Sequence, residues 1–325
     1  TRYLADGTVA PGWAPGDSYD SGIALFAYPW SGYPLFAFED EAGGVLVLDL
    51  AVRCAKTCGG DARHLLASHV TPDGTLAPGW TSEGLSLAFL GDIKVKQHVT
   101  AAADGRAGAV AAWTMRPWTF VPGWYQMREL RARRLTGSGQ SVWGDELGLM
   151  LRSATVVESF SEVIIADGSE GAYVYWLDER EPGLFGQHVS HDGLLSWAED
   201  GAPIPIAGST TLSNLQVVPD GSHGAMLGWL ADAENGKELL IARLNHDGIP
   251  AWPGGVRRLA ATEFRGEYRM IEAQGGGAIV CWTVALGDSG HAILAQRFNH
   301  GGHALWGPVG VVESGAPGRK EHHAM

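Results

Sequence analysis

The sequence predicts an all-β protein, and three features of the chain lead to this prediction. Short runs rich in β-branched and aromatic residues alternate with turns that contain Gly or Asp, and we find no convincing amphipathic helix pattern. A polar turn followed by tryptophan is written six times, at Trp13, Trp80, Trp143, Trp197, Trp252 and Trp306. The gaps between these tryptophans are 67, 63, 54, 55 and 54 residues, which defines a repeat of roughly fifty-five residues.

Each repeat carries a second landmark, an apolar run that ends before the turn tryptophan. These runs end at Trp113, Trp176, Trp229 and Trp282, and Asp49 holds the same place in the first complete repeat. Nine residues earlier stand Asp40, Asp104, Asp167, Asp220 and, as the exception, Ala273. Each repeat therefore predicts a strand, an Asp turn, an apolar strand, a third strand, a turn, and a fourth strand opened by tryptophan. Continuously apolar strands suit sheets buried on both faces, and four-stranded units that cover one another form a β-propeller.

The repeat boundaries predict a single propeller domain over residues 1–314 and a polar tail over 315–325. Five complete repeats are expected over 33–89, 90–153, 154–207, 208–261 and 262–314. A half repeat over 1–27 precedes them and holds only a third and a fourth strand. The ring then has either five blades with a surplus hairpin, or six blades with part of one outside this sequence. Six tryptophan turns favour six.

Composition and charge exclude several classes of partner. A net charge of −13 and a pI near 5.3 argue against a nucleic-acid partner or an anionic membrane surface. The sequence contains no apolar run that approaches the length of a membrane span, and its start is not a secretory signal. The start lacks an initiator Met and lies inside a repeat, so we expect a processed chain or a piece of a longer protein.

The three cysteines predict one disulfide and no metal site. Cys54 and Cys58 form a C-x₃-C pattern without a second ligand pair at zinc spacing, so a small disulfide is expected. A disulfide would fit an oxidising compartment, and hence a secreted or cell-surface location. Cys281 is expected to be a buried thiol. Nothing in the sequence calls for a cofactor or a metal.

A basic residue recurs near the end of the third strand in all six copies. It is Arg2, His69, Arg134, His188, Arg243 and Arg297. Because the first and third turns of a four-stranded unit lie at the same edge, the turn Asp should approach this residue. We therefore predict the contacts Asp104–Arg134, Asp167–His188 and Asp220–Arg243. Arg297 faces Ala273 and should lack that partner. A structural brace is the favoured role, and a functional ring of cations is the alternative.

Irregular segments add aromatic residues that lie outside the repeat pattern. The loop between second and third strands is long in the first two complete repeats, and a smaller excess precedes the first of them. These segments hold Trp30, Tyr33, Trp118, Phe120, Trp124 and Tyr125. Both kinds of loop open on the same face of a propeller, so we expect a shared aromatic rim that binds a ligand. Inserts that fold down and bury their own aromatics are the alternative.

Polar residues at the starts of the first strands form a second candidate site. Six residues before each turn position stand Pro34, His98, Ser161, Asn214 and Glu267. Of these, His98, Asn214 and Glu267 are candidates for a ligand-binding mouth of the axial channel. The alternative is that they are ordinary channel residues in contact with water.

Two resemblances accompany this pattern. The run Gly-Gly-Ala-Ile-Val-Cys-Trp with the following Ile-Leu-Ala-Gln-Arg-Phe-Asn-His-Gly-Gly-His-Ala-Leu-Trp resembles propeller repeats of secreted and surface bacterial proteins. The turn at Ser190, Asp192 and Gly193 resembles the Asp-box of sialidases, but its Asp and Gly are adjacent rather than separated by one residue. The arginine triad and tyrosine nucleophile of sialidases cannot be assembled from this sequence, so their activity is not carried over.

These observations predict a non-enzymatic extracellular binding or assembly module with a glycan or protein partner on the aromatic loop face. One alternative is a propeller-fold polysaccharide hydrolase or lyase that acts at the channel mouth. Another is a purely structural propeller within a larger surface assembly. Motifs for nucleotide binding, zinc proteolysis and serine hydrolysis are missing from the sequence.

Overall fold

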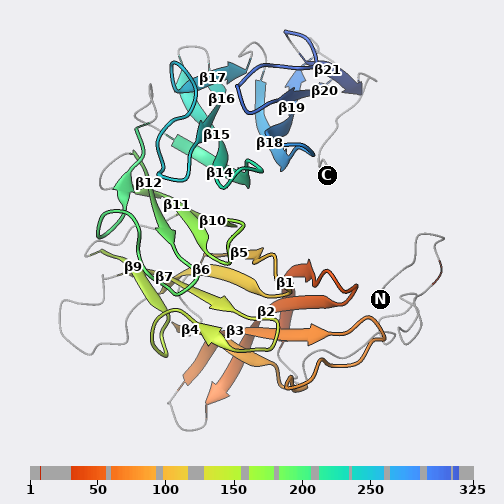
Figure 1. Cartoon of the computed structure of the whole chain (residues 1–325), viewed down its shortest axis with the longest axis vertical. Helices are drawn as coiled ribbons and strands as arrows, with labels where there is room; N and C mark the ends of the chain where they lie inside the picture. Colours follow the sequence, from red (N-terminus) through yellow and green to blue (C-terminus); the bar gives the residue numbers. More distant parts are fainter. Residues whose placement is uncertain are drawn as a thin grey trace. The chain divides into compact units, whose positions relative to one another are not determined.

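The structure is a computed structural model that describes most of the chain. The described residues are 8, 31–55, 60–92, 98–115, 128–154, 161–178, 183–205, 212–233, 236–259, 264–285, 291–308 and 310–314. The regular elements among these residues are all β-strands, and they form five antiparallel sheets (Figure 1).

In four of the sheets the strands are neighbours in chain order, and in the second sheet the last two strands both pair with its third. The first sheet contains β1 (Ser31–Glu39), β2 (Val45–Ala55), β3 (Gly60–Val70) and β4 (Leu85–Asp92). The second contains β5 (Val99–Ala103), β6 (Ala109–Met115), β7 (Arg128–Leu135), the short β8 (Ser141–Val142) and β9 (Leu149–Ala154). The third contains β10 (Ser161–Ala166), β11 (Ala172–Asp178), β12 (Gly183–Val189) and β13 (Ala202–Pro203). The fourth contains β14 (Leu212–Pro219), β15 (Ala225–Ala233), β16 (Gly236–Leu244) and β17 (Val256–Leu259). The fifth contains β18 (Phe264–Glu272), β19 (Ala278–Ala285), β20 (His291–Phe298) and β21 (Val311–Ser314).

This all-β architecture of four-stranded blades confirms the predicted fold class. The half repeat expected over 1–27 lies outside the described residues except for Thr8, so the number of blades stays a prediction. The chain divides into two compact units. The first comprises residues 1–173 and 188–200, and the second comprises 174–187 and 201–325.

The apolar strands are buried because neighbouring sheets pack face to face. In the first compact unit, Leu48 and Leu65 of the first sheet share a core with Ala111 and Trp113 of the second. All seven residues of β6 are buried. This two-sided burial explains why the second strands are continuously apolar rather than alternating.

The second compact unit repeats this packing between its last two sheets. Ile241 and Leu259 of the fourth sheet share a core with Val280 and Trp282 of the fifth. In both units, therefore, the tryptophan of a second strand packs toward the preceding sheet.

The first strands of neighbouring sheets lie side by side, as the inner strands of a propeller do. In the first compact unit the Ile164 amide donates to Oγ1 of Thr100 over 3.4 Å. In the second, the Gln216 side chain donates to the Tyr268 carbonyl over 2.7 Å and accepts from the Met270 amide over 3.0 Å. Thr100 and Gln216 occupy the same position in their repeats, four residues before the turn Asp.

The recurring tryptophan does not open the fourth strand, so that part of the predicted pattern is wrong. Trp143 precedes β9 by six residues, and Trp252 precedes β17 by four. Each indole instead donates to a carbonyl in the third turn of the next sheet. Trp143 reaches His191 over 3.1 Å, and Trp252 reaches His300 over 2.7 Å. These tryptophans therefore lie in the connection before the fourth strand, where the indole joins one sheet to the next.

Replacing Gly193 by alanine is expected to lower the free energy of unfolding by about 2–3 kcal/mol. Gly193 has a φ of 85°, and a Cβ there would lie 2.9 Å from Cδ1 of Trp143. Gly105 provides the matched control, because its φ is 75° and the described structure places no atom within 4 Å of its added Cβ. Gly105→Ala should cost only the conformational part, about 1 kcal/mol. Urea unfolding compares the two variants, and equal losses would mean that the indole does not restrict the turn.

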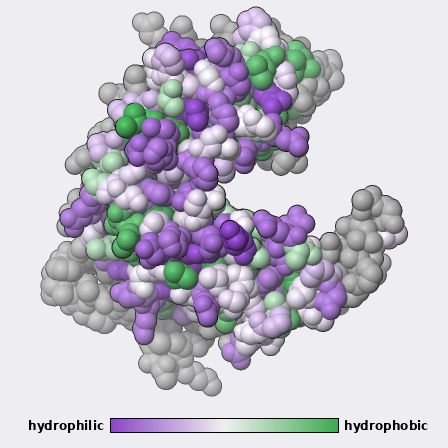
Figure 2. All heavy atoms as spheres, in the orientation of Figure 1, coloured by the Kyte–Doolittle hydropathy of each residue, from purple (hydrophilic) through white to green (hydrophobic). Residues whose placement is uncertain are grey.

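The face shown in Figure 2 is mainly hydrophilic, and its hydrophobic patches are small. The large apolar residues that are exposed include Leu194, Ile249, Leu305 and Val312, which lie on different turns and strands. Scattered residues of this kind are normal on a protein surface and do not mark an interface. Among the residues that the structure describes, no helix is long and apolar enough to cross a membrane.

Candidate functional site

The Asp of the first turn closes that turn with its own carboxylate. Oδ1 of Asp220 accepts from the amides of Ser222 and Gly224 over 2.7 and 2.8 Å, while Oδ2 accepts from Nε of Arg243 over 2.7 Å. Asp104 makes the same three contacts in the second sheet. One buried side chain thereby satisfies two turn amides and fixes the end of the third strand.

The three contacts expected between turn Asp and basic residue are all present. The nitrogen–oxygen distances are 3.0 Å for Asp104–Arg134, 2.8 Å for Asp167–His188 and 2.7 Å for Asp220–Arg243. A fourth pair, Asp40–His69, is 2.8 Å apart. Arg297, opposite Ala273, has no carboxylate partner among the described residues and donates to the Gln274 carbonyl over 2.6 Å.

These pairs change the acidity of the turn carboxyls. Burial alone would raise the pKa of Asp220, but the hydrogen bonds from Arg243 and from two backbone amides outweigh it and lower the pKa. The same balance lowers the pKa of Asp40 and of Asp167, where the side-chain partner is His69 or His188. Ionised, hydrogen-bonded carboxylates in these positions favour a structural role over a ring of free cations.

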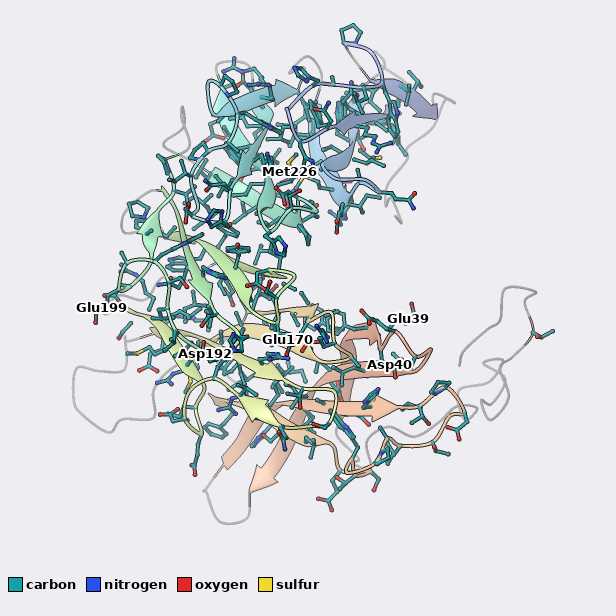
Figure 3. All side chains as sticks on the ribbon, viewed as in Figure 1. Glu39, Asp40, Glu170, Asp192, Glu199 and Met226 are labelled. Atoms are coloured by element: carbon teal, nitrogen blue, oxygen red, sulfur yellow. The ribbon has the colours of Figure 1, made fainter. Side chains whose placement is uncertain are left out.

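The basic residues also reach the next sheet. Arg134 contacts Glu170, which lies with the first turn of the third sheet, and Nδ1 of His69 lies 3.1 Å from the Gly137 carbonyl. Figure 3 labels Asp40 and Glu170 on their respective turns. The brace therefore acts within a sheet and between neighbours.

Most of the predicted aromatic rim lies outside the described residues. This holds for Trp30, Trp118, Phe120, Trp124 and Tyr125. The backbone of Tyr33 belongs to β1, and its side chain is outside the description. The aromatic site therefore stays a prediction.

The predicted disulfide also involves a residue that the structure does not describe. Cys54 lies on β2, Cys58 is outside the described residues, and Cys281 is a buried thiol as expected. The described part of the chain contains no disulfide. It also contains no group of three or more metal-ligating residues.

The three polar candidates of the channel mouth all lie near the beginning of a first strand. His98 directly precedes β5 in the first compact unit. Asn214 on β14 and Glu267 on β18 belong to the second, at places where the pairing register shifts. The Asn214 carbonyl accepts from the Tyr268 hydroxyl over 2.6 Å, whereas the Glu267 side chain is exposed. The structure thus links Asn214 to the neighbour of Glu267, rather than to Glu267 itself.

His98 belongs to a polar cluster around Glu162, a residue that the sequence analysis did not select. Nδ1 of His98 lies 3.1 Å from Oε1 of Glu162, and Oγ1 of Thr114 donates to this carboxylate over 3.3 Å. The Glu162 side chain is completely buried, while the His98 side chain is 53% exposed. The cluster thus connects a buried carboxylate to the protein surface through a single imidazole.

The repeat contains a signal that could have identified Glu162. The position five residues before the turn is Leu35, Val99, Leu215 or Tyr268 in the other four complete repeats, and Glu162 alone is charged. The other repeats show that the fold accepts an uncharged side chain at this position, so packing does not require a carboxylate there. The Glu162 carboxylate has four lone-pair sites and two polar partners among the described residues. It can therefore accept further hydrogen bonds or exchange a proton.

Asp49 is a second buried carboxyl at an exceptional repeat position. It replaces the tryptophan of the other second strands, is 1% exposed, and its Oδ1 has no hydrogen-bond partner among the described residues. Burial raises its pKa, and a backbone hydrogen bond from Leu50 opposes that shift only in part.

Replacing Asp49 by asparagine is expected to raise the free energy of unfolding at pH 8 by about 1 kcal/mol. Because the pKa of the folded state is raised, the wild-type protein loses stability as the pH rises above the unfolded value of about 4. Asparagine does not titrate, so the advantage of Asp49→Asn should be present at pH 8 and small at pH 4. Urea unfolding at both values measures this difference. An equal difference at both would show that ionisation of Asp49 is not its cause.

Comparison with known proteins yields only distant structural similarity. The sequence matches no protein family and no curated protein. Sucrose-6-phosphate hydrolase from Lactobacillus gasseri is similar with a TM-score of 0.40 and 11% identity, over 83% of this chain and 62% of that chain. β-Fructofuranosidase from Schwanniomyces occidentalis, complexed with fructosyl-erythritol, is similar with a TM-score of 0.39 and 9% identity, over 92% of this chain and 61% of that chain. AofleA from Arthrobotrys oligospora is similar with a TM-score of 0.38 and 12% identity, over 91% of this chain and 94% of that chain. This chain spans less than two thirds of the length of the first two proteins.

Proposed function

We propose that this chain is an extracellular carbohydrate-binding module whose ligand contacts His98, the exposed member of its polar cluster with Thr114 and Glu162. The observation that carries the proposal is the fully buried carboxylate of Glu162, at a position where the other complete repeats are apolar. This desolvated carboxylate holds the His98 imidazole in place for a sugar, whose hydroxyls can donate or accept hydrogen bonds. The half-exposed His98 gives such a ligand a polar contact at the surface.

The sequence places aromatic residues directly beside this cluster along the chain. Thr114 stands at the end of β6, and the insert that contains Trp118 and Trp124 begins two residues later. Val99, at the start of β5, pairs with Trp113, so the start of the first strand and the end of the second share one edge of the sheet. Aromatic rings near convergent polar groups suit a sugar, which offers apolar C–H faces as well as hydroxyls.

Hydrolysis is the second candidate, and the Glu162–His98 contact favours it specifically. A buried carboxyl next to an imidazole is suited to general acid–base chemistry. Glycoside hydrolysis usually employs two carboxyl groups about 5–10 Å apart, with direct roles for both. Among the described residues the polar partners of Glu162 are His98 and Thr114, and neither is a carboxyl. This arrangement supports binding more than turnover.

The test is a glycan array probed with the full chain, followed by a reducing-end assay on the glycans that bind. We expect saturable binding and no release of reducing ends over a day of incubation. Release of reducing ends would show that the chain is a hydrolase and not a binding module. An array with no binding at all would overturn both and favour an assembly role with a protein partner.

An extracytoplasmic location accompanies the proposal, because surface glycans are exposed there. A Cys54–Cys58 disulfide would fit the same compartment. Mass spectrometry of the non-reduced chain tests the disulfide, since a free-thiol mass at both cysteines would remove that support.

A further inference from the structure

The second compact unit contains a cavity of about 190 Å³ that is unrelated to the Glu162 cluster. It lies between β17 of the fourth sheet and the β19, β20 and third-turn residues of the fifth. Its lining includes Arg257, Arg258, Leu259, Trp282, Gln296 and Phe298. None of its lining residues is acidic, although the whole chain carries a net charge of −13.

Arg257 is held in place at this cavity by four interactions. Its guanidinium lies 5.3 Å from the centre of the Trp252 ring. Its Nε donates to the Gly302 carbonyl over 3.3 Å, and its Nη1 donates to the carbonyls of Pro253 and Val256 over 3.0 and 3.2 Å. Within the described part of the chain, Nη2 has no partner. The side chain is therefore pre-organised and keeps donor capacity for a ligand.

The other polar side chains at the cavity have their hydrogen bonds within the protein. The Gln296 amide donates to the Gly307 carbonyl over 2.6 Å, and its oxygen accepts from the amides of Arg297 and Trp306 over 2.9 Å each. The neighbouring Arg258 pairs with Glu238 over 3.1 Å.

We propose that this cavity binds a small carboxylate that has a flat apolar face, and that a uronic acid is its ligand class. The carboxylate would bind Arg257 through charge-assisted hydrogen bonds, and the sugar ring would lie against Trp282 and Phe298. The cavity is smaller than the roughly 300–1,000 Å³ of pockets for drug-sized ligands, so it suits a single sugar ring. The absence of acidic lining residues favours an anionic over a neutral sugar. This inference does not depend on the Glu162 site.

Isothermal titration of the full chain with glucuronate, and with glucose as the neutral control, tests this site. We expect saturable binding of glucuronate and binding of glucose that is roughly tenfold weaker or more. Equal binding of the two sugars, or no binding of glucuronate up to about 50 mM, would overturn the proposal. These two titrations establish whether the chain prefers an anionic sugar to a neutral one.

Variants then locate the site. Arg257→Gln should weaken glucuronate binding roughly tenfold or more, whereas Arg269→Gln, at an exposed position of β18 outside the cavity lining, should stay within about twofold of the wild type. Arg257→Lys keeps the charge and should give an intermediate loss, even if Arg257→Gln melts at a lower temperature. Similar losses in Arg257→Gln and Arg269→Gln would contradict the assignment. Glu162→Leu should bind glucuronate at this cavity like the wild type. A failure of the cavity proposal can therefore be distinguished from a failure of the proposed function.

Discussion

Replacing Asp220 by alanine is expected to lower the free energy of unfolding by about 3–5 kcal/mol. The Asp220 side chain is completely buried and accepts hydrogen bonds from two turn amides and from Arg243, whose side chain is 20% exposed. Its removal leaves a partly buried guanidinium and two amides without their acceptor, and such groups are costly in the interior. Urea unfolding at pH 7, followed by tryptophan fluorescence, measures the loss.

Asp247→Ala is the matched control, because Asp247 lies on the third turn of the same sheet. Its side chain is 58% exposed and its ion-pair partner is His246, at 3.3 Å. We expect a change of about 0.5 kcal/mol or less for Asp247→Ala. Comparable losses at Asp220 and Asp247 would refute the structural role of the buried pair.

The pH dependence of this loss has a definite sign. The pKa of Asp220 is lower in the folded state than the unfolded value of about 4. Its ionisation therefore stabilises the protein above that unfolded value, and this contribution is lost as the pH falls through the folded-state pKa. The difference between the wild type and Asp220→Ala should be constant from pH 5 to 8 and shrink below pH 4. A difference that grows on acidification would contradict this account.

The contact between Asp220 and Arg243 could be predicted from the sequence because it depends on the register within one sheet. Once a repeat is recognised as four antiparallel strands, its first and third turns must share an edge. The sequence therefore predicts both the pairs between turn Asp and basic residue and the exception at Ala273. The fold class follows from the same periodicity, since apolar second strands such as β6 need cover on both faces.

Features that depend on contacts between sheets were not accessible from the pattern of one repeat. The Trp143 indole binds the His191 carbonyl, 48 residues further along the chain, and this contact removes the tryptophan from the strand where the pattern had placed it. Glu162 was missed for a related reason. Its partners His98 and Thr114 come from the preceding sheet, so its own repeat shows only an unusual residue in an apolar strand.

The aromatic inserts show a different limit. Residues such as Trp118 and Trp124 have no counterpart in the compact repeats, and therefore no register from which to place them. Only the strand ends that flank an insert are fixed by the fold. The end of β6 at Met115 and the start of β7 at Arg128 thus define where the insert leaves and re-enters the sheet.

Replacing Glu162 by leucine is expected to abolish glycan binding while the fold is retained. Leucine stands at the corresponding position in two other repeats, at residues 35 and 215, so the inner strand accepts this side chain. The buried Thr114 hydroxyl loses its acceptor, and the desolvation cost of the carboxylate disappears with it. These effects oppose each other, so the free energy of unfolding should change by about 1 kcal/mol or less. Array binding and urea unfolding of the same preparation provide both measurements.

Two further substitutions separate binding from catalysis at this carboxyl. Glu162→Gln keeps a hydrogen-bond acceptor without the charge, so a binding site should lose about tenfold in affinity rather than all of it. In a hydrolase, Glu162→Gln would instead abolish turnover and leave ligand affinity largely intact, because an amide cannot exchange the proton. His98→Gln should weaken binding at least as strongly as Glu162→Leu, since the imidazole is the half-exposed contact and the carboxylate is completely buried. Wild-type glycan affinity in Glu162→Leu would exclude this cluster from the binding site, and the aromatic inserts would then have to bind the ligand without it.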